Sequence, residues 1–279
     1  MATPAGEIAV VLRGKVKHQD GSRVVVGDHV LLDAGGIIGS ETRRNVLERR
    51  AVGGRSSRAV AANLDRVLVM TAVTQPKPIL GLIDRLLTIA EANDIPTGLV
   101  ITKIDLASHA DLSHRFRAAG YQVWPASIRT GEGIEALAHE LHGRVTLLTG
   151  PSGVGKSSLL NRIQPGLQLP TQEISAKIER GKNTTVSAVM VPLDAGGFLV
   201  DTPGFSDVGL AGIEPRELAS CFPELRGLID RCRFPDCRHL IEPGCAVRAA
   251  VDVGTVDPSR YESYRGLLAE LTGAPRPWE

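Results

Sequence analysis

Residues 150–157 read Gly-Pro-Ser-Gly-Val-Gly-Lys-Ser and form a complete G-x-x-x-x-G-K-S motif, the signature of a phosphate-binding loop. The glycines let backbone N–H groups surround a phosphate, and the N-terminus of the following helix completes the anion site. We expect Lys156 to bridge the β- and γ-phosphate oxygens and the Ser157 hydroxyl to coordinate Mg²⁺. A glycine-rich turn with a chance lysine is the weaker alternative, because a strand-like run precedes the loop and helical residues follow it. The predicted nucleotide-binding residues of this loop are Gly150, Ser152, Gly153, Val154, Gly155, Lys156, Ser157 and Ser158.

A second motif, Thr102-Lys103-Ile104-Asp105, is of the type that reads a guanine base. The Asp105 carboxylate would accept hydrogen bonds from the ring N–H and the exocyclic amine of guanine, which adenine cannot supply. A buried acceptor pair that the wrong base leaves unpaired discriminates by roughly 10⁴-fold. Lys103 would pack its stem over the purine, and Ser127 matches a second base-contacting loop. Thr102 stands where such motifs usually have asparagine, which predicts a weaker affinity. The alternative is an ordinary loop acid.

The third motif, Asp201-Thr202-Pro203-Gly204, follows an apolar run that predicts a strand. There Asp201 would hold Mg²⁺ through water, and the Gly204 N–H would sense the γ-phosphate. Residues 180–185 form a polar segment before this motif, in which Thr184 or Thr185 would complete the Mg²⁺ shell as a switch segment does. An exposed loop without a ligand is the alternative for that segment.

The order of these motifs is more informative than any one of them. An ordinary GTPase has the phosphate loop first, then the Asp-x-x-Gly motif and then the base motif. Here the base motif at 102–105 precedes the loop at 150–157, and the metal motif at 201–204 follows it. The order predicts a circularly permuted GTPase. Phe205 takes the position where many GTPases carry a water-orienting glutamine, so we expect slow intrinsic hydrolysis.

A cysteine and histidine cluster predicts a metal site of a different kind. Cys232, Cys237, His239 and Cys245 form C-x₄-C-x-H-x₅-C within fourteen residues. Three thiolates and one imidazole make a closed tetrahedral set, which is typical of a structural Zn²⁺ ion. Buried reduced cysteines beside a surface histidine are the alternative. Cys221 lies outside this spacing and is expected to be a buried thiol.

The composition limits the class of protein. The chain has 279 residues, of which 43% are hydrophobic and 23% charged, and a formal net charge of +1. Any nucleic-acid contact must therefore come from a local basic patch. No apolar run is long enough to span a membrane, and no secretory signal is visible at the start, so we expect a cytoplasmic protein without membrane contact.

Three domains are expected along the chain. Residues 1–58 carry β-branched runs and a segment, 43–58, with six arginines against one acid. Glycines and serines mark that segment as partly a linker. Residues 59–210 alternate strand and helix, which predicts an α/β domain with a mainly parallel sheet and its ligands at the carboxyl ends of the strands. Residues 211–279 are mainly helical and hold the metal cluster.

The chain resembles the RsgA family of GTPases that depend on the small ribosomal subunit. The resemblance is carried by Val26-Gly27-Asp28, Thr130-Gly131-Glu132-Gly133, the phosphate loop through Ser158, Asp201-Thr202-Pro203-Gly204-Phe205, Glu242-Pro243-Gly244-Cys245 and Arg260-Tyr261-Glu262-Ser263-Tyr264. It implies an N-terminal OB-fold-like domain, a permuted GTPase domain and a C-terminal helical zinc-binding domain. It also implies a late assembly factor that binds the small subunit and its rRNA and whose GTP hydrolysis the subunit stimulates. Arginines of the basic segment are the candidate rRNA contacts: Arg43, Arg44, Arg49 and Arg50.

The chain departs from the family at a few places. The family's usual Gly-Lys-His-Thr-Thr-Thr is here Gly181-Lys182-Asn183-Thr184-Thr185-Val186, and Asn183 cannot titrate as a histidine does. The N-terminal β domain is also short, as though its first strand or two were missing. The catalytic residues expected from the motifs and the resemblance together are Lys156, Asn183, Thr184, Thr185 and Gly204.

Two functional hypotheses remain open at this point, with a third weaker one. The first is a monomeric enzyme that hydrolyses GTP to GDP when docked on the small subunit, with Mg²⁺ as the nucleotide's metal and one structural Zn²⁺. The second is a GTP-sensing module that binds RNA or the ribosome and has little hydrolytic activity, which Asn183 and the short β domain favour. The third is an ATPase with an unrelated partner.

Overall fold

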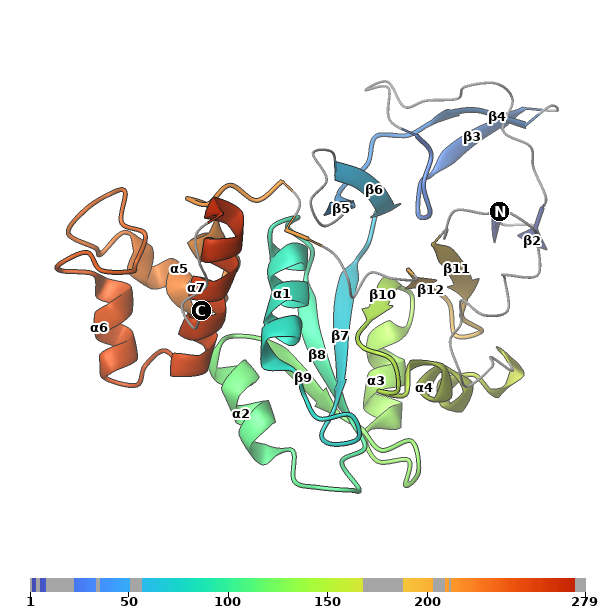
Figure 1. The fold of residues 1–279 in the computed structure, drawn as a ribbon. Helices are drawn as coiled ribbons and strands as arrows, with labels where there is room; N and C mark the ends of the chain where they lie inside the picture. The colour runs from blue at the N-terminus through green and yellow to red at the C-terminus, as the bar shows by residue number, and fades with distance from the viewer. Residues whose placement is uncertain are drawn as a thin grey trace.

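The computed structural model describes residues 2–3, 6–8, 23–33, 36–50, 57–167, 188–202, 209–210 and 212–273. Its centre is one sheet with helices on both faces, between a region of short strands formed by the N-terminal residues and a group of helices formed by the C-terminal ones (Figure 1). The predicted α/β class is confirmed.

The central sheet has six strands in the order β11-β12-β10-β7-β8-β9. The strands are β7 (Arg66–Ala72), β8 (Thr97–Thr102), β9 (Gln122–Pro125), β10 (Val145–Thr149), β11 (Val189–Pro192) and β12 (Phe198–Asp201). All neighbours pair in parallel except β11, which runs antiparallel to β12 at one edge. Because β8, β10 and β12 are parallel, the three motifs that follow them along the chain emerge at the same edge of the sheet.

Helices cover both faces of this sheet. One face carries α1 (Leu80–Glu91) and α2 (Ala110–Ala118), whose apolar side chains share a cluster with β7 and β8. The other face carries α3 (Ile134–Leu141) and α4 (Lys156–Ile163), with a short 3₁₀ helix at 165–167 after α4. Strand β7 is buried on both faces, which explains its near-continuous apolar run. The predicted alternation of strands and helices is confirmed for the described part of residues 59–210.

The N-terminal residues pair two strands at a time. Antiparallel pairs form between β1 (Ala2–Thr3) and β2 (Gly6–Glu7), β3 (Val30–Asp33) and β4 (Gly36–Ser40), and β5 (Val46–Arg50) and β6 (Ser57–Ala62). These pairs do not close a barrel among the described residues, so the OB-fold expectation stays a prediction. Strands β5 and β6 take up part of the arginine-rich segment, and Leu47 and Ala61 of this pair face the core. The glycines and serines that suggested a linker lie almost entirely in residues 51–56, outside the described residues, so the linker expectation stays a prediction.

The C-terminal helices do not have a core of their own. They are α5 (Pro223–Ile229), α6 (Ala246–Asp252) and α7 (Pro258–Thr272), preceded by a 3₁₀ helix at Leu218–Cys221. Phe222, Val247 and Tyr264 lie in the same apolar cluster as Leu86 and Phe116 of the sheet's helices. The two parts therefore share one buried core across the expected boundary near residue 210.

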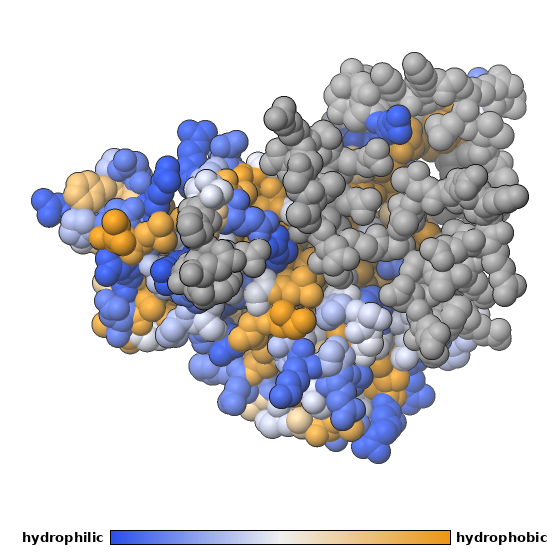
Figure 2. All heavy atoms as spheres, viewed as in Figure 1, coloured by the Kyte–Doolittle hydropathy of each residue, from blue (hydrophilic) through white to orange (hydrophobic). Residues whose placement is uncertain are grey.

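The surface is that of a mixed, charged protein. Figure 2 shows polar residues over much of the C-terminal helices and the lower part of the molecule, with smaller apolar patches between them. Among the described residues, we find no helix whose length and apolar character would allow it to cross a bilayer.

Candidate nucleotide site and metal centre

The phosphate loop lies against the end of the central strand. It connects β10 to α4, and Gly150, Gly153 and Gly155 all have positive φ angles. A Cβ atom on Gly150 would lie 2.3 Å from the carbonyl oxygen of Met70, so only glycine lets the loop leave the sheet there. The Lys156 ammonium donates to the carbonyls of Gly150 and Pro151 at 2.6 and 3.0 Å. Ser157 follows it in the first turn of α4 and is buried.

Asp201 lies beside this loop. It is the last residue of β12 and pairs in register with Leu148, two residues before Gly150. The Asp201 carboxylate at the end of β12 and the Ser157 hydroxyl in the helix that follows β10 thus lie at one edge of the sheet. Both are oxygen ligands of the kind that Mg²⁺ prefers. Gly204, Asn183, Thr184 and Thr185 lie outside the described residues, and their predicted roles stay predictions.

The base motif and its second loop meet at Asp105. The Ser127 hydroxyl donates to one carboxylate oxygen at 2.6 Å and itself accepts the Thr130 N–H at 3.1 Å. Arg129 donates through Nε to the other oxygen at 2.8 Å. These hydrogen bonds, from Ser127 first and Arg129 second, lower the pKa of Asp105 below its ordinary value. The carboxylate is therefore an ionised acceptor near neutral pH. Arg129 was missed by the sequence analysis, although its position two residues after Ser127 could have suggested it.

Thr102 contacts the phosphate loop through its side chain. Its side chain is fully buried, and its hydroxyl lies 2.6 Å from the Val154 carbonyl and 3.2 Å from that of Thr71. The shorter contact is the better hydrogen bond. The side chain therefore links the base strand to the phosphate loop. Lys103 extends beside it, with its ammonium donating to the Gln75 carbonyl.

Replacing Thr102 by valine should weaken nucleotide binding without changing base preference. The substitution keeps the side-chain shape but leaves the buried Val154 carbonyl without this donor, at a cost of roughly 1–3 kcal/mol. We expect the affinities for GDP and IDP to fall together, by about fivefold or more, because the Asp105 contacts are untouched. Fluorescence titration of both nucleotides measures this, with Thr102→Ser as the control that keeps the hydroxyl. Unequal losses for the two bases would contradict this role.

The four predicted metal ligands come together. Their ligand atoms all lie within 4.8 Å of one another. Cys232 Sγ is 4.0 Å from Cys245 Sγ, and the Nδ1 atom of His239 is 3.4 and 3.5 Å from these two sulfurs. Tetrahedral zinc with its usual bond lengths requires about 3.8 Å between sulfurs and about 3.6 Å between sulfur and nitrogen. Burial lowers the pKa of His239 and so favours the neutral imidazole that binds metals. The donor set fits Zn²⁺.

The predicted RNA-binding arginines differ in what they contact. Arg43 forms two hydrogen bonds to the Asp28 carboxylate at 2.7 and 2.9 Å, and its side chain is only 8% exposed. This pair gives Arg43 a structural role in the N-terminal region. Arg44 is exposed and pairs with Asp65 at 2.7 Å. Arg49 and Arg50 lie on β5, and their side chains are outside the described set.

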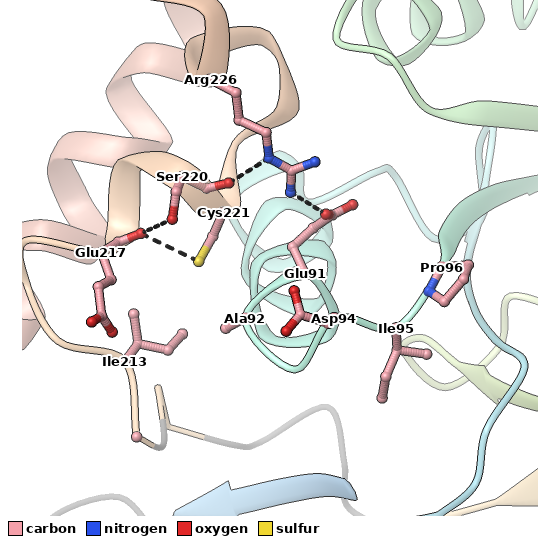
Figure 3. A pocket seen from close by; sticks show the side chains of 11 residues that line it. Glu91, Ala92, Asp94, Ile95, Pro96, Ile213, Glu217, Ser220, Cys221 and Arg226 are labelled. Carbon is pink, nitrogen blue, oxygen red and sulfur yellow. Dashed lines mark hydrogen bonds and ion pairs between the residues drawn. The ribbon is translucent and has the colours of Figure 1, made fainter. Parts of the chain in front are cut away.

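A separate pocket lies away from the candidate nucleotide site. There the loop before β8 faces the 3₁₀ helix Leu218–Cys221 and α5 (Figure 3). Its volume is about 510 Å³, and its walls include Glu91 and Asp94 on one side and Ile213 and Cys221 on the other. Arg226 crosses between the walls and pairs with Glu91. Cys221 is buried, as expected, and burial raises the pKa of its thiol to about 11.

Comparisons with known proteins agree with this geometry. The sequence model of the RsgA GTPase family matches residues 40–211. A protein of Gemmatimonas aurantiaca named small ribosomal subunit biogenesis GTPase RsgA is 48% identical, over 97% of this chain and 93% of its own length. Its namesake in Moorella thermoacetica is 42% identical, over 95% and 90%. The crystal structure of YjeQ from Thermotoga maritima superposes with a TM-score of 0.76 at 36% identity, over 98% of this chain and 93% of that one. YloQ, described as a circularly permuted GTPase, gives a TM-score of 0.70 at 30% identity, over 94% and 85%.

Proposed function

The chain belongs to the RsgA GTPase family, and we propose on that basis that it hydrolyses GTP as an assembly factor of the small ribosomal subunit. The observation that carries the nucleotide half of this proposal is the convergence of Asp105, Ser127 and the phosphate loop at one edge of the sheet. The ribosomal half rests on the names of relatives that match nearly the whole chain.

In this proposal each side chain of the nucleotide site has one task. Asp105 accepts the two N–H donors of guanine, Ser127 orients that carboxylate, and Lys103 lies along the purine. Lys156 moves from the loop carbonyls to the β- and γ-phosphate oxygens, an exchange of one set of charge-assisted hydrogen bonds for a stronger one. Thr102 keeps the base strand and the phosphate loop in register.

Two oxygen donors would hold the nucleotide's Mg²⁺, directly through Ser157 and through water at Asp201. When bound, the ion neutralises the charge that develops on the transferred phosphoryl group. Thr184 or Thr185 would complete its shell, the Gly204 N–H would contact the γ-phosphate, and Asn183 would hydrogen-bond the attacking water. These roles rest on the sequence motifs.

The cysteine and histidine cluster would hold one structural Zn²⁺. All four ligand positions are protein side chains, so such an ion has no open position for catalysis. It would stabilise a segment that otherwise contributes only part of the shared core, by an amount on the order of 10 kcal/mol.

The ribosomal surface is proposed for the N-terminal region. Arg44, and Arg49 and Arg50 of β5, supply cations for rRNA phosphates, while Arg43 serves to hold Asp28. The functional division into residues 1–58, 59–210 and 211–279 is kept as a proposal, although the last two share a core. We expect the protein to act as a monomer and in the cytoplasm.

GTP turnover of the purified protein, alone and with small ribosomal subunits, tests the function. We expect a slow basal rate and a large stimulation by the subunits, since Phe205 cannot orient water. Lys156→Ala supplies the background and should show no stimulation. Flat, slow turnover with intact GTP binding would instead identify a nucleotide-dependent binding protein.

A further inference from the structure

The histidine of the metal cluster lies in an unusual backbone conformation. His239 has a φ of +58°, which is uncommon for a residue other than glycine and costs free energy that other contacts must offset. The turn brings its Nδ1 atom within 3.5 Å of two cysteine sulfurs. Something in the surrounding structure must therefore hold residues 238–241 in this turn.

One carboxylate meets that need. Glu242 accepts three backbone N–H groups of the turn, from Arg238 at 2.9 Å on one oxygen, and from Leu240 at 2.7 Å and Ile241 at 3.0 Å on the other. The three donors come from the residues on both sides of His239. A charged acceptor strengthens each of these bonds relative to a neutral one.

Helix α7 holds the carbonyl side of the same turn. The Tyr261 hydroxyl donates to the His239 carbonyl at 2.6 Å, and the Tyr264 hydroxyl donates to the Arg238 carbonyl at 2.9 Å. The turn thus has its N–H groups on a carboxylate and two of its carbonyls on phenols. None of these three side chains is among the residues that could bind the metal.

We infer that Glu242 is the positioning residue of the metal centre, which fixes His239 as a ligand by holding the backbone turn around it. The inference rests on the metal site proposed above and goes beyond its four ligands. Groups that orient metal ligands in this way usually change metal affinity by about 10- to 100-fold when they are removed.

Glutamine at position 242 is the sharpest variant. It keeps the size of the side chain but replaces one acceptor oxygen by an NH₂ group. That group is a donor, so it cannot accept a hydrogen bond from the N–H groups of the turn. Competition for Zn²⁺ with a chromophoric chelator should show a loss of affinity of about 10- to 100-fold for Glu242→Gln. Tyr261→Phe, which removes one hydroxyl, should give a smaller loss in the same direction.

Glu262→Gln is the matched control. Glu262 lies on α7 in the same part of the molecule and pairs with Arg265 at the surface, so the same chemical change there should leave the Zn²⁺ affinity unaltered. Loading with Co²⁺ separates positioning from general destabilisation. At saturating Co²⁺ the d–d bands of Glu242→Gln should weaken as the histidine loosens, whereas a variant of lower stability alone would keep the wild-type spectrum.

Two results would overturn the inference, and they are distinguishable. If the wild type binds Zn²⁺ and Glu242→Gln binds it equally well with an unchanged Co²⁺ spectrum, Glu242 does not position the ligand. If the wild type takes up no Zn²⁺, the proposed metal site is wrong and the inference falls with it.

Discussion

Replacing Asp105 by asparagine should change the base preference of the nucleotide site from guanine to xanthine. A carboxylate offers only acceptors, which match the two N–H donors of guanine, whereas an asparagine amide offers one acceptor and one donor. Xanthine presents that complementary pair, an N–H group and a carbonyl. A site that leaves its polar groups unpaired rejects the wrong partner by roughly 10⁴-fold, so the preference for GDP over XDP should fall by about that factor.

Titration with fluorescent GDP and XDP measures this change. Asp111→Asn is the control, because Asp111 is an exposed acid in the first turn of α2 and makes the same chemical change away from the site. The low pKa of Asp105 has a further consequence. Because the pKa of Asp105 lies below the ordinary aspartate value of about 4, its carboxylate is charged throughout the range from about pH 6 to 8. The preference of the wild-type protein for guanine should therefore not vary with the protonation of Asp105 over this range. A variant at position 105 that still prefers GDP would show that the base is read elsewhere.

Replacing Arg260 by leucine should lower the free energy of unfolding by about 3–5 kcal/mol, the usual cost of removing one partner of a buried ion pair. Arg260 is 1% exposed and donates to Asp84 of α1 at 2.7 Å and to Glu224 of α5 at 2.6 and 3.0 Å. Its guanidinium also lies 4.6 Å from the centre of the Phe222 ring. Without it, two carboxylates would remain buried between the sheet's helices and the C-terminal helices.

Unfolding in guanidinium chloride, followed by circular dichroism, measures the loss in the free energy of unfolding. We expect one cooperative transition, because the C-terminal helices and the sheet's helices share an apolar cluster. Arg265→Leu is the control on the same helix: Arg265 is partly exposed and pairs with Glu262, and such pairs contribute at most about 1 kcal/mol. Equal losses in the two variants, or a separate transition for the C-terminal helices, would contradict the role of Arg260 as the link between the two parts.

The central sheet and its motifs could be predicted because their signals are local. Apolar runs end directly at Thr102, Thr149 and Asp201, and the structure ends β8, β10 and β12 at those residues. The four metal ligands lie close together in the chain, so their spacing alone limited how they could meet. The pairing of β5 with β6 was harder to predict, because it depends on the burial of Leu47 and Ala61 in a core that residues far away in the chain complete.

The sequence by itself predicted the chemistry from neighbouring residues: a phosphate-binding loop, a carboxylate that would read the base, and a closed set of thiolates and an imidazole for a metal ion. Only the tertiary structure decided which groups support them. Thr102 donates to a loop 52 positions away, Arg129 reaches Asp105 across 24 positions, and Arg260 meets Asp84 across 176. Contacts of this kind depend on the order of the strands and the packing of the helices. The type of each residue does not indicate which distant residue it will contact. The physical reason is that a hydrogen bond forms only between atoms that are close in space, and the separation of two residues along the chain does not specify that distance.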